Sequence, residues 1–314
     1  MPPTFDPSRR RVLRSGAIGA ATVGLGPLLL AACGGSEPDP AAAPVLVALF
    51  SPNRVIAAGR PQRLPFGLVD TEAVTSLPDD AEIGVTIRSG DTVIDTTTAR
   101  SHVVTHDHPE GNGEVPHEHA DLARYFAVRT NLPEPGIYDL DVDLGASVAS
   151  LAVQAFDPDE IRVLLPGEAM PAITTPTVDD PGSIEVLCTR LPEPCPFHDH
   201  SVDQLLGARR PMAVLVATPS LCQTAYCGPV VDTLMELAPD SPGVDLVHLE
   251  VYENPESAGW DYTNPEMRVL PALDELGLDF EPSLFLVDSA GVIADRIDNV
   301  FDVEELRVAL ASLS

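Results

Sequence analysis

An uninterrupted apolar run at residues 211–218 leads into a turn that holds Cys222 and Cys227, and a segment with helical spacing follows at residues 228–238. A buried strand that passes straight into a helix is the unit from which α/β sheets are built. The first turn of such a helix has unpaired N–H groups and a partial positive charge, which stabilise a thiolate relative to a thiol. The two cysteines therefore occupy a position suited to thiol chemistry, with a structural disulfide as the alternative.

The segments on either side of this turn also alternate between strand and helix. Ser201 and Gln204 fit a capping box, so a short helix is predicted from there to Gly207. The later predicted elements are a strand at residues 244–251, a helix at 271–276, strands at 283–288 and 292–297, and a terminal helix at 303–313. This order predicts an α/β domain over residues 195–314.

Residues 45–157 have a different character, because short β-branched runs are broken by Pro, Gly and Asp without a helical period. Asp139, Asp141 and Asp143 alternate with apolar residues and should share one face of a strand. The predicted strands are residues 45–50, 63–69, 83–88, 92–98, 125–129, 137–144 and 149–156. The Pro-Gly-x-Tyr sequence that ends at Tyr138 resembles a corner of immunoglobulin-like sandwiches, so this domain is predicted to be all-β and immunoglobulin-like. Residues 158–194 are rich in Pro and are predicted to be a linker.

The N-terminus resembles an export signal. Arg9 and Arg10 lie in a Ser-Arg-Arg-x-Val-Leu-Arg sequence that is similar to the twin-arginine motif, and Leu-Ala-Ala-Cys at residues 30–33 resembles a lipobox. This resemblance implies a signal at residues 1–32, lipidation of Cys33 and a Pro- and Ala-rich tether over residues 33–44. We therefore expect an extracytoplasmic protein that is anchored to the cell membrane through Cys33.

The charged residues exclude some classes of partner and chemistry. The chain has 48 acidic residues against 18 basic ones, all of them arginine, which gives a formal net charge of −30. Nucleic acid is therefore not an expected partner, because phosphate binding needs a basic surface. The absence of lysine excludes a P-loop and Schiff-base chemistry.

The second domain resembles a thioredoxin. Tyr226-Cys227-Gly228-Pro229 is similar to the Trp-Cys-Gly-Pro start of the thioredoxin active site, and Pro282 stands where that family carries a cis proline facing the cysteines. The resemblance implies a thiol-disulfide oxidoreductase that requires no cofactor, acts on a protein disulfide and uses Cys227, Cys222 and Pro282. The whole chain also resembles actinobacterial lipoproteins, exported by the twin-arginine route, with a thioredoxin-like C-terminal domain.

The cysteine spacing departs from that family, since its second cysteine would fall at Val230. The Cys-x4-Cys sequence also resembles atypical two-cysteine peroxiredoxins, in which Cys222 would be the peroxidatic and Cys227 the resolving residue. A copper-delivery branch of the fold uses Cys-x3-Cys, one residue shorter. A further alternative is a non-catalytic metal-handling or scaffolding lipoprotein. On the redox interpretation we expect one reversible disulfide, with Cys227 of lower pKa and partly exposed and Cys222 more enclosed.

Two other groups could carry chemistry. Cys188 and Cys195 flank two prolines and are predicted to form a disulfide that closes a surface loop, with His198 and His200 in a solvated capping loop nearby. Five histidines gather within eighteen residues and could ligate copper or zinc, with weak adventitious binding as the alternative; they are His102, His106, His108, His117 and His119.

Overall fold

The computed structural model describes residues 45–69, 77–78, 80–104, 124–145 and 147–313. All of these residues belong to one compact unit that spans residues 42–314. The predicted signal, tether and Cys33 lie outside the described residues, as do His106, His108, His117 and His119. Within the described part, no helix has the length and apolar character needed to cross a bilayer.

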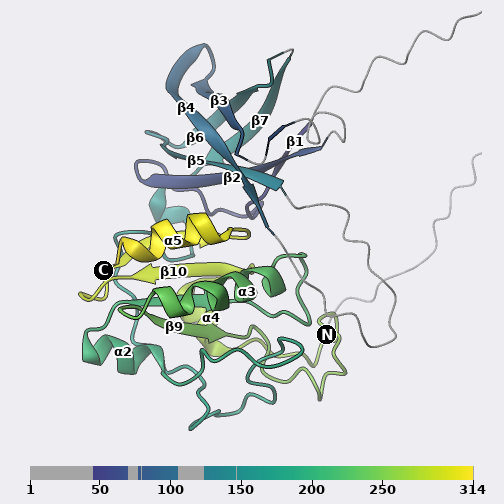
Figure 1. The fold of residues 1–314 in the computed structure, drawn as a ribbon, viewed down its shortest axis with the longest axis vertical. Coiled ribbons are helices and arrows are strands. Elements are labelled where there is room, and N and C mark those ends of the chain that lie inside the picture. Colours follow the sequence, from purple (N-terminus) through teal and green to yellow (C-terminus); the bar gives the residue numbers. More distant parts are fainter. Residues whose placement is uncertain (1–44, 70–76, 79, 105–123, 146, 314) are drawn as a thin grey trace, which may run out of the picture. The chain divides into compact units, whose positions relative to one another are not determined.

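The first part of the described chain is an antiparallel sheet of seven strands (Figure 1). The strands are β1 (Val45–Ala48), β2 (Pro61–Val69), β3 (Glu82–Ser89), β4 (Thr92–Val103), β5 (Arg124–Asn131), β6 (Gly136–Asp143) and β7 (Val148–Ala155). Their order across the sheet is β1-β2-β5-β4-β3-β6-β7. All seven predicted strands are therefore present, and the all-β character of this part of the chain is confirmed.

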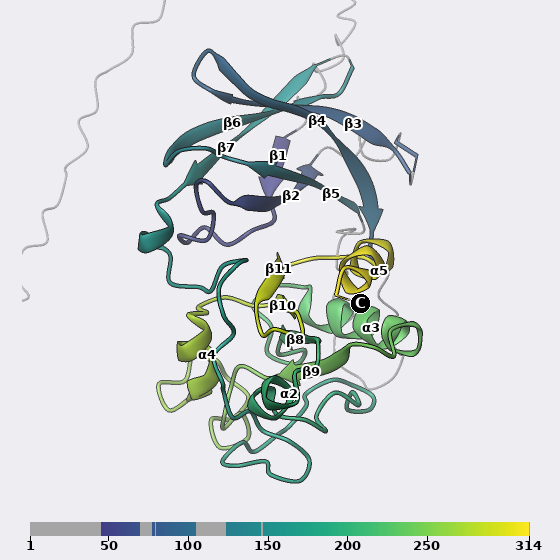
Figure 2. The same cartoon turned by 90° about the vertical axis from the view of Figure 1, so that its left-hand side faces the viewer.

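Hydrogen bonding joins the seven strands into one continuous, curled sheet. The cause is β4, whose twelve residues pair with β3 at the start of the strand and with β5 over Arg100–Val103 at its end. This long strand joins the two halves of the sheet. The edge strands β1 and β7 contact each other, so the sheet curls around a single apolar core (Figure 2).

Strand β6 shows why the sequence folds this way. Tyr138, Leu140 and Val142 are buried in the core, while the intervening aspartates point outward on one face, as their alternation predicts. The Tyr138 hydroxyl donates a hydrogen bond of 2.7 Å to the carbonyl of Glu134. This bond closes the Pro-Gly-x-Tyr corner onto the turn before the strand.

The second part contains four helices and a four-stranded sheet. Its elements are α2 (Val202–Ala208), β8 (Met212–Val216), α3 (Cys227–Leu237), β9 (Asp245–Leu249), α4 (Pro271–Leu276), β10 (Ser283–Val287), β11 (Ile293–Asp298) and α5 (Val303–Ala311). The sheet order is β11-β10-β8-β9, with β8 and β9 parallel and the other pairs antiparallel. Single-turn 3-10 helices occur at η1 (Pro158–Glu160) and η2 (Ala238–Asp240). Each predicted element of this part is present, and the backbone N–H of Ser201 donates to Gln204 Oε1 in the predicted capping contact at 3.3 Å.

Both faces of this sheet are covered, which explains why its central strands are apolar throughout. All five residues of β8 are fully buried. Ala213 and Leu215 pack in the cluster that contains residues of α3 and α5, whereas Met212, Val214 and Val216 pack in the cluster that contains residues of α2 and α4. Figure 2 shows α3 and α5 on one face of the sheet and α4 on the other.

Residues 158–194, predicted as a linker, contain only η1 as a regular helix but are packed against the second part of the chain. The backbone N–H groups of Gly167 and Met170 donate to the carbonyls of Ile293 and Gly291. Leu165 and Ile173 are buried. Pro and Thr prevent long helices here, but the apolar side chains between them still bury against the sheet. This segment therefore forms part of the fold, and Cys188 lies near its end.

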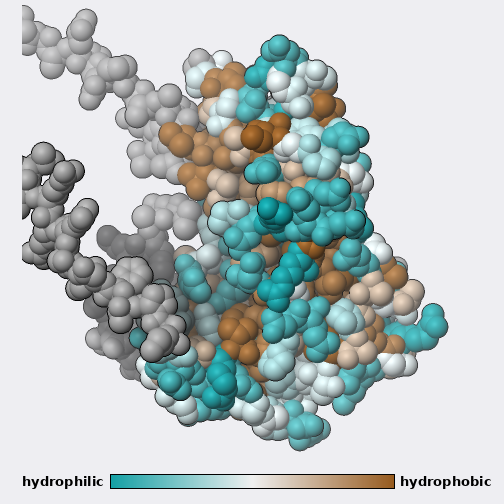
Figure 3. Space-filling model, turned by 180° about the vertical axis from the view of Figure 1, so that it is seen from behind, coloured by the Kyte–Doolittle hydropathy of each residue, from teal (hydrophilic) through white to brown (hydrophobic). Residues whose placement is uncertain are grey.

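One face of the surface mixes brown apolar patches with teal polar side chains (Figure 3). Large apolar side chains that are exposed include Ile137, Leu191, Trp260 and Val308. Scattered exposure of this kind is normal for a folded chain.

Candidate functional site

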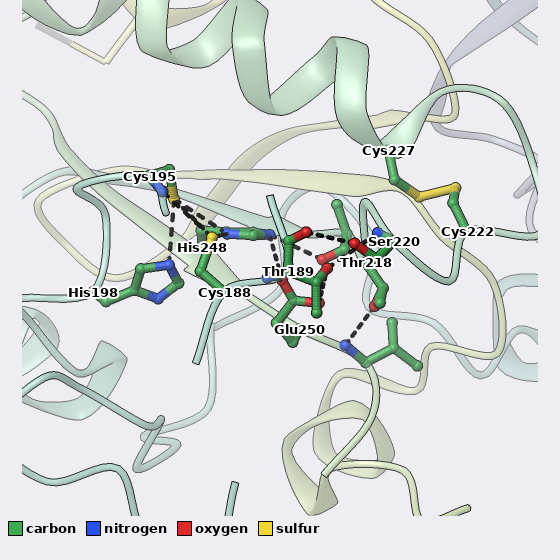
Figure 4. Close-up of polar contacts among 12 residues, drawn as sticks. Cys188, Thr189, Cys195, His198, Thr218, Ser220, Cys222, Cys227, His248 and Glu250 are labelled. Atoms are coloured by element: carbon green, nitrogen blue, oxygen red, sulfur yellow. Dashed lines mark hydrogen bonds and ion pairs between the residues drawn. A yellow bond between two sulfur atoms is a disulfide. The ribbon is translucent and has the colours of Figure 1, made fainter. Parts of the chain in front are cut away.

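The turn between β8 and α3 carries a disulfide between Cys222 and Cys227, whose Cα atoms are 5.9 Å apart (Figure 4). Helix α3 begins at Cys227 itself, with Pro229 in its first turn. Proline is tolerated there because the N–H group that it lacks would have no partner within the helix. The Cys227 sulfur thus lies at the positive end of the helix, as the sequence predicts.

The exposure of the two cysteines is the reverse of what we expected. Cys227 is fully buried, and Cys222 is partly exposed. The physical reason is that Cys227 belongs to the first turn of a helix whose inner side packs on the sheet, together with Val230 and Leu234. Cys222 lies in the loop outside that helix. An incoming reactant can therefore reach the Cys222 sulfur more easily than the Cys227 sulfur.

A buried carboxyl group adjoins the disulfide. The two sulfurs and a carboxylate oxygen of Glu281 all lie within 4.8 Å of one another. Burial raises the pKa of Glu281 from 4.5 to about 8; contact with Thr218 lowers the pKa and the charge of Glu250 raises it. Glu281 is therefore largely protonated at neutral pH and can act as a proton donor beside the disulfide.

Pro282 follows Glu281 and is joined to it by a cis peptide bond, as predicted. The pair lies directly before β10, which runs through the middle of the sheet next to β8. The end of β8 and the start of β10 therefore bring the disulfide and Glu281 together from positions about sixty residues apart in the chain.

Cys188 and Cys195 do not form the predicted disulfide, because both are free thiols. Their sulfurs are 3.8 Å apart, and both residues are buried. His198 lies with Nε2 3.3 Å from the Cys195 sulfur, and His248 of β9 lies with Nδ1 3.3 Å from the same sulfur and 3.7 Å from that of Cys188. All four ligand atoms lie within 4.8 Å of one another (Figure 4). This buried cluster, the Cys2His2 cluster, could hold a metal ion.

The expectation of a solvated His198 is also wrong, although His200 is exposed as predicted. His198 is 3 % exposed because it packs behind Cys195, next to the ring of His248. The aspartate between the two histidines turns outward to solvent. Only one member of the His-x-His sequence therefore reaches the interior.

The electrostatics of the Cys2His2 cluster favour negative charge on the Cys188 sulfur. The contact with the Cys195 thiol lowers the pKa of Cys188, and the same contact raises that of Cys195, because one thiolate accepts a hydrogen bond from the other thiol. Burial lowers the pKa of His248, but contact with Cys188 and the charge of Glu250 outweigh that effect and raise it. Burial raises the pKa of Glu250 to about 7.

Hydrogen bonds link the Cys2His2 cluster to the disulfide loop. Thr189, the residue after Cys188, donates from its backbone N–H and its hydroxyl to the two carboxylate oxygens of Glu250, at 2.6 and 3.0 Å. Ser220 in turn donates from its N–H to the Thr189 hydroxyl and from its own hydroxyl to the Thr189 carbonyl, at 3.1 and 2.6 Å. Ser220 is two residues before Cys222. We call these bonds between Thr189, Ser220 and Glu250 the Thr189 clasp (Figure 4).

His102 is the one described member of the predicted histidine cluster. Its Nδ1 atom lies 2.9 Å from a carboxylate oxygen of Asp302, and its ring stacks on that of Tyr125 at 4.8 Å between centroids. These contacts account for His102 as a packed side chain. The other four histidines of the predicted copper or zinc site lie outside the described residues.

Sequence reasoning missed two groups of the site. One is Glu281, which stands directly before the predicted cis Pro282. The other is His248, which alternates with Glu250 in an otherwise apolar run, so that His248 in β9 and Glu250 directly after the strand point to the same side. Alternating polar residues in an otherwise buried strand were the available signal.

Comparison with known proteins gives limited information. No family model and no curated protein matches the chain. Among solved structures, MTB dsbF has 18% sequence identity and a TM-score of 0.31, covering 46% of this chain and 99% of its own. The superoxide reductase neelaredoxin from Ignicoccus hospitalis has 11% identity and a TM-score of 0.18 over 36% of this chain and 77% of its own. Salmonella alpha-2-macroglobulin has 12% identity and a TM-score of 0.25 over 84% of this chain and 15% of its own. These scores carry no argument about fold or function, so the proposals below rest on the chain's own geometry.

Proposed function

We propose that the chain is a thiol-disulfide oxidoreductase with a thioredoxin-like second part, and that the Cys222–Cys227 disulfide is its redox-active bond. The supporting observation is the set of three groups at one place: a disulfide at the start of α3, a partly exposed Cys222 sulfur and a protonated Glu281 carboxyl. The order of strands and helices and the cis proline before β10 support the thioredoxin-like assignment.

The first step is attack by a thiolate of the partner protein on the more accessible sulfur, that of Cys222. A bond forms between the two sulfurs, the Cys222–Cys227 bond breaks, and the electron pair leaves on the Cys227 sulfur. The helix N-terminus stabilises the leaving thiolate. Glu281 gives that sulfur its proton and becomes a carboxylate.

A second thiolate of the partner then attacks the partner's own sulfur in the mixed disulfide. This breaks the bond to Cys222, whose partly exposed sulfur leaves as a thiolate and takes a proton from solvent, so that a disulfide remains in the partner and a dithiol in this chain. Two electrons have passed from the partner to this chain. The reverse sequence reduces a partner disulfide, and the reduction potential of the pair decides the direction.

The experiment compares two single substitutions that differ only in which sulfur remains. In Cys227→Ser the partly exposed Cys222 stays and should form a stable mixed disulfide with a small aromatic disulfide reagent. In Cys222→Ser the buried Cys227 stays and should react at least about tenfold more slowly, because its access is restricted. Equal rates would contradict the assigned attack on Cys222.

The potential of the wild-type pair tests the function itself. We expect a value within about −120 to −270 mV, the range of catalytic dithiols, from equilibration with glutathione or dithiothreitol buffers. A value below about −300 mV would identify a structural disulfide and end the proposal.

The partial exposure of Cys222 also favours the peroxide-reductase alternative, in which Cys222 is oxidised to a sulfenic acid and Cys227 resolves it. One equivalent of hydrogen peroxide added to the reduced protein separates the two functions. The oxidoreductase should react no faster than a free cysteine, whereas a peroxidase would re-form the disulfide much faster.

We also propose that the protein acts outside the cytoplasm, held at the membrane by lipidated Cys33. The supporting features are the twin-arginine sequence and the lipobox. Cys33→Ser should release the protein from the membrane fraction, and replacing Arg9 and Arg10 by Lys should retain it inside the cell. A Cys33→Ser protein that still resists extraction by salt would contradict the anchor.

A further inference from the structure

The Cys2His2 cluster has the geometry of a metal site. Two zinc-bound sulfurs at about 2.3 Å from the ion and at the tetrahedral angle would be about 3.8 Å apart, and a sulfur and a ring nitrogen about 3.6 Å apart. The two sulfurs lie 3.8 Å apart, and the sulfur–nitrogen contacts are 3.3, 3.3 and 3.7 Å. The four side chains therefore already hold their ligand atoms close to the corners of the required tetrahedron.

The hydrogen atoms of His248 are arranged for metal binding. Its Nε2 atom lies 2.9 Å from the carbonyl oxygen of Ala217, and since a carbonyl only accepts, Nε2 carries the proton and donates it. The lone pair is then on Nδ1, the atom that faces both sulfurs. A metal-bound histidine commonly donates its other N–H to a carbonyl in this way, which fixes the orientation of the ring.

Two further contacts fit the same interpretation. The backbone N–H of Cys195 donates to the Cys188 sulfur at 3.3 Å, a bond that stabilises a thiolate. His198 directs Nε2 at the cluster, while its Nδ1 is buried and has no hydrogen bond within the described residues. A buried imidazole whose single polar contact is a weak one to sulfur is costly, and binding of Nε2 to an ion would give the ring a strong partner.

We propose that Cys188, Cys195, His198 and His248 form a closed, four-coordinate Zn²⁺ site. Two thiolates and two imidazoles in a tetrahedron are a donor set that zinc prefers, and four protein ligands leave no open position, which is typical of structural zinc. All four side chains are buried, so the site excludes water from the ion. The site is separate from the disulfide, whose residues are not among the ligands.

The position of the site gives it a second consequence, which rests on the proposed function. Thr189 follows the ligand Cys188 directly, and through the Thr189 clasp it holds Ser220 in the loop that carries Cys222. Glu250, two residues after the ligand His248, accepts both hydrogen bonds of Thr189. Zinc therefore ties residues 188–198 to β9 and so keeps the attacked sulfur in place.

Metal content and coordination test the site without any redox assay. We use the full chain with His106, His108, His117 and His119 replaced by Asn, so that the predicted histidine cluster cannot contribute ligands. We expect one equivalent of zinc per chain by elemental analysis. X-ray absorption should give two sulfurs at about 2.3 Å and two nitrogens at about 2.0 Å. Cys188→Ser and His248→Gln should lose the zinc, whereas His200→Gln, which changes the exposed neighbour of His198, should keep it.

A second measurement applies if the ligand variants do not fold. In the protein that keeps all four ligand residues, titration with an organomercurial should release one zinc ion for every two cysteine thiols that are modified. Two results would overturn the proposal: a Cys188–Cys195 disulfide in the purified chain without bound metal, or no release of zinc when the two thiols are modified. Neither result depends on the reduction potential of Cys222 and Cys227.

The consequence for the loop is measured separately. In the reduced protein, removal of zinc by a chelator should raise the rate of Cys222 alkylation at least about fivefold, because the loop that carries Cys222 would lose hydrogen bonds of the Thr189 clasp worth about 1 kcal/mol each. Thr189→Val should raise the rate in the zinc-loaded protein. An unchanged rate in both cases would refute the coupling while leaving the zinc site and the proposed function to their own tests.

Discussion

Glu281 makes a prediction about stability that can be worked out from its surroundings. Burial raises its pKa from 4.5 to about 8, with smaller effects from Thr218, Glu250 and His248. Its two carboxylate oxygens are buried and make no hydrogen bond of normal geometry within the described residues. Replacing Glu281 by Gln keeps the size and polarity of the side chain but removes its titration.

The direction in which stability changes with pH follows from proton binding in the native and unfolded states. Between pH 4.5 and about 8 the native state keeps the proton of Glu281, while the unfolded state has lost it, so the free energy of unfolding falls as the pH rises. The stabilisation by the neutral carboxyl is fully present below pH 4.5 and is lost through about pH 8. A tenfold change in proton affinity is worth about 1.4 kcal/mol, so the whole effect is about 5 kcal/mol by pH 9.

Urea unfolding of the oxidised protein at pH 5, 7 and 9 measures this effect. The wild-type protein and Glu281→Gln should have similar stability at pH 5, and the variant should be more stable by about 3 kcal/mol at pH 7 and about 5 kcal/mol at pH 9. Glu236→Gln, at an exposed position on α3, is the matched control and should show no such trend. A difference between Glu281→Gln and wild type that stays constant from pH 5 to 9 would refute the reasoning.

Four further outcomes are expected. Glu281→Gln should slow reduction of the disulfide by dithiothreitol at pH 7 by about a hundredfold and remove the inflection near pH 8 from the rate profile, because it removes the proton donor; stopped-flow kinetics would measure both. Glu305→Ala should lower the free energy of unfolding by about 3–5 kcal/mol, because it leaves the guanidinium of Arg63, at 2.6 Å from the Glu305 carboxylate, buried without its partner; denaturant titration checks this. Leu215→Ala in the fully buried strand β8 should cost about 3–5 kcal/mol in the same assay. Gly277→Ala should lower the melting temperature, since a Cβ atom there would lie 2.0 Å from the carbonyl oxygen of Arg162, and Glu275→Ala serves as its control.

The elements that could be predicted from the sequence are those defined by local patterns. The alternation in β6 and the apolar run of β8 identify these strands, and the prolines and glycines around residues 271–276 mark the ends of α4. The disulfide was also predictable, because Cys222 and Cys227 are close in sequence and a compact turn joins them.

The Cys2His2 cluster could not be predicted, because its members come together only through the fold. Cys188 and Cys195 flank two prolines that indicate a surface loop, and His248 comes from a strand more than fifty residues away. Their contact depends on residues 158–194 packing against the sheet. The relative exposure of Cys222 and Cys227 was predicted wrongly for a related reason: the side of α3 that faces the core is set by tertiary packing and not by the position of the helix start.

The packing of residues 158–194 has a consequence for the order in which the chain can fold. These residues are made before their partners, since they bond to β11 and to the end of α4. Arg296 reaches back to the carbonyl of Leu164 across a sequence separation of 132 residues. Contacts so far apart form only after a long loop has closed, which slows folding. Residues 164–170 can therefore reach their final place only after α4 and β11 have been made.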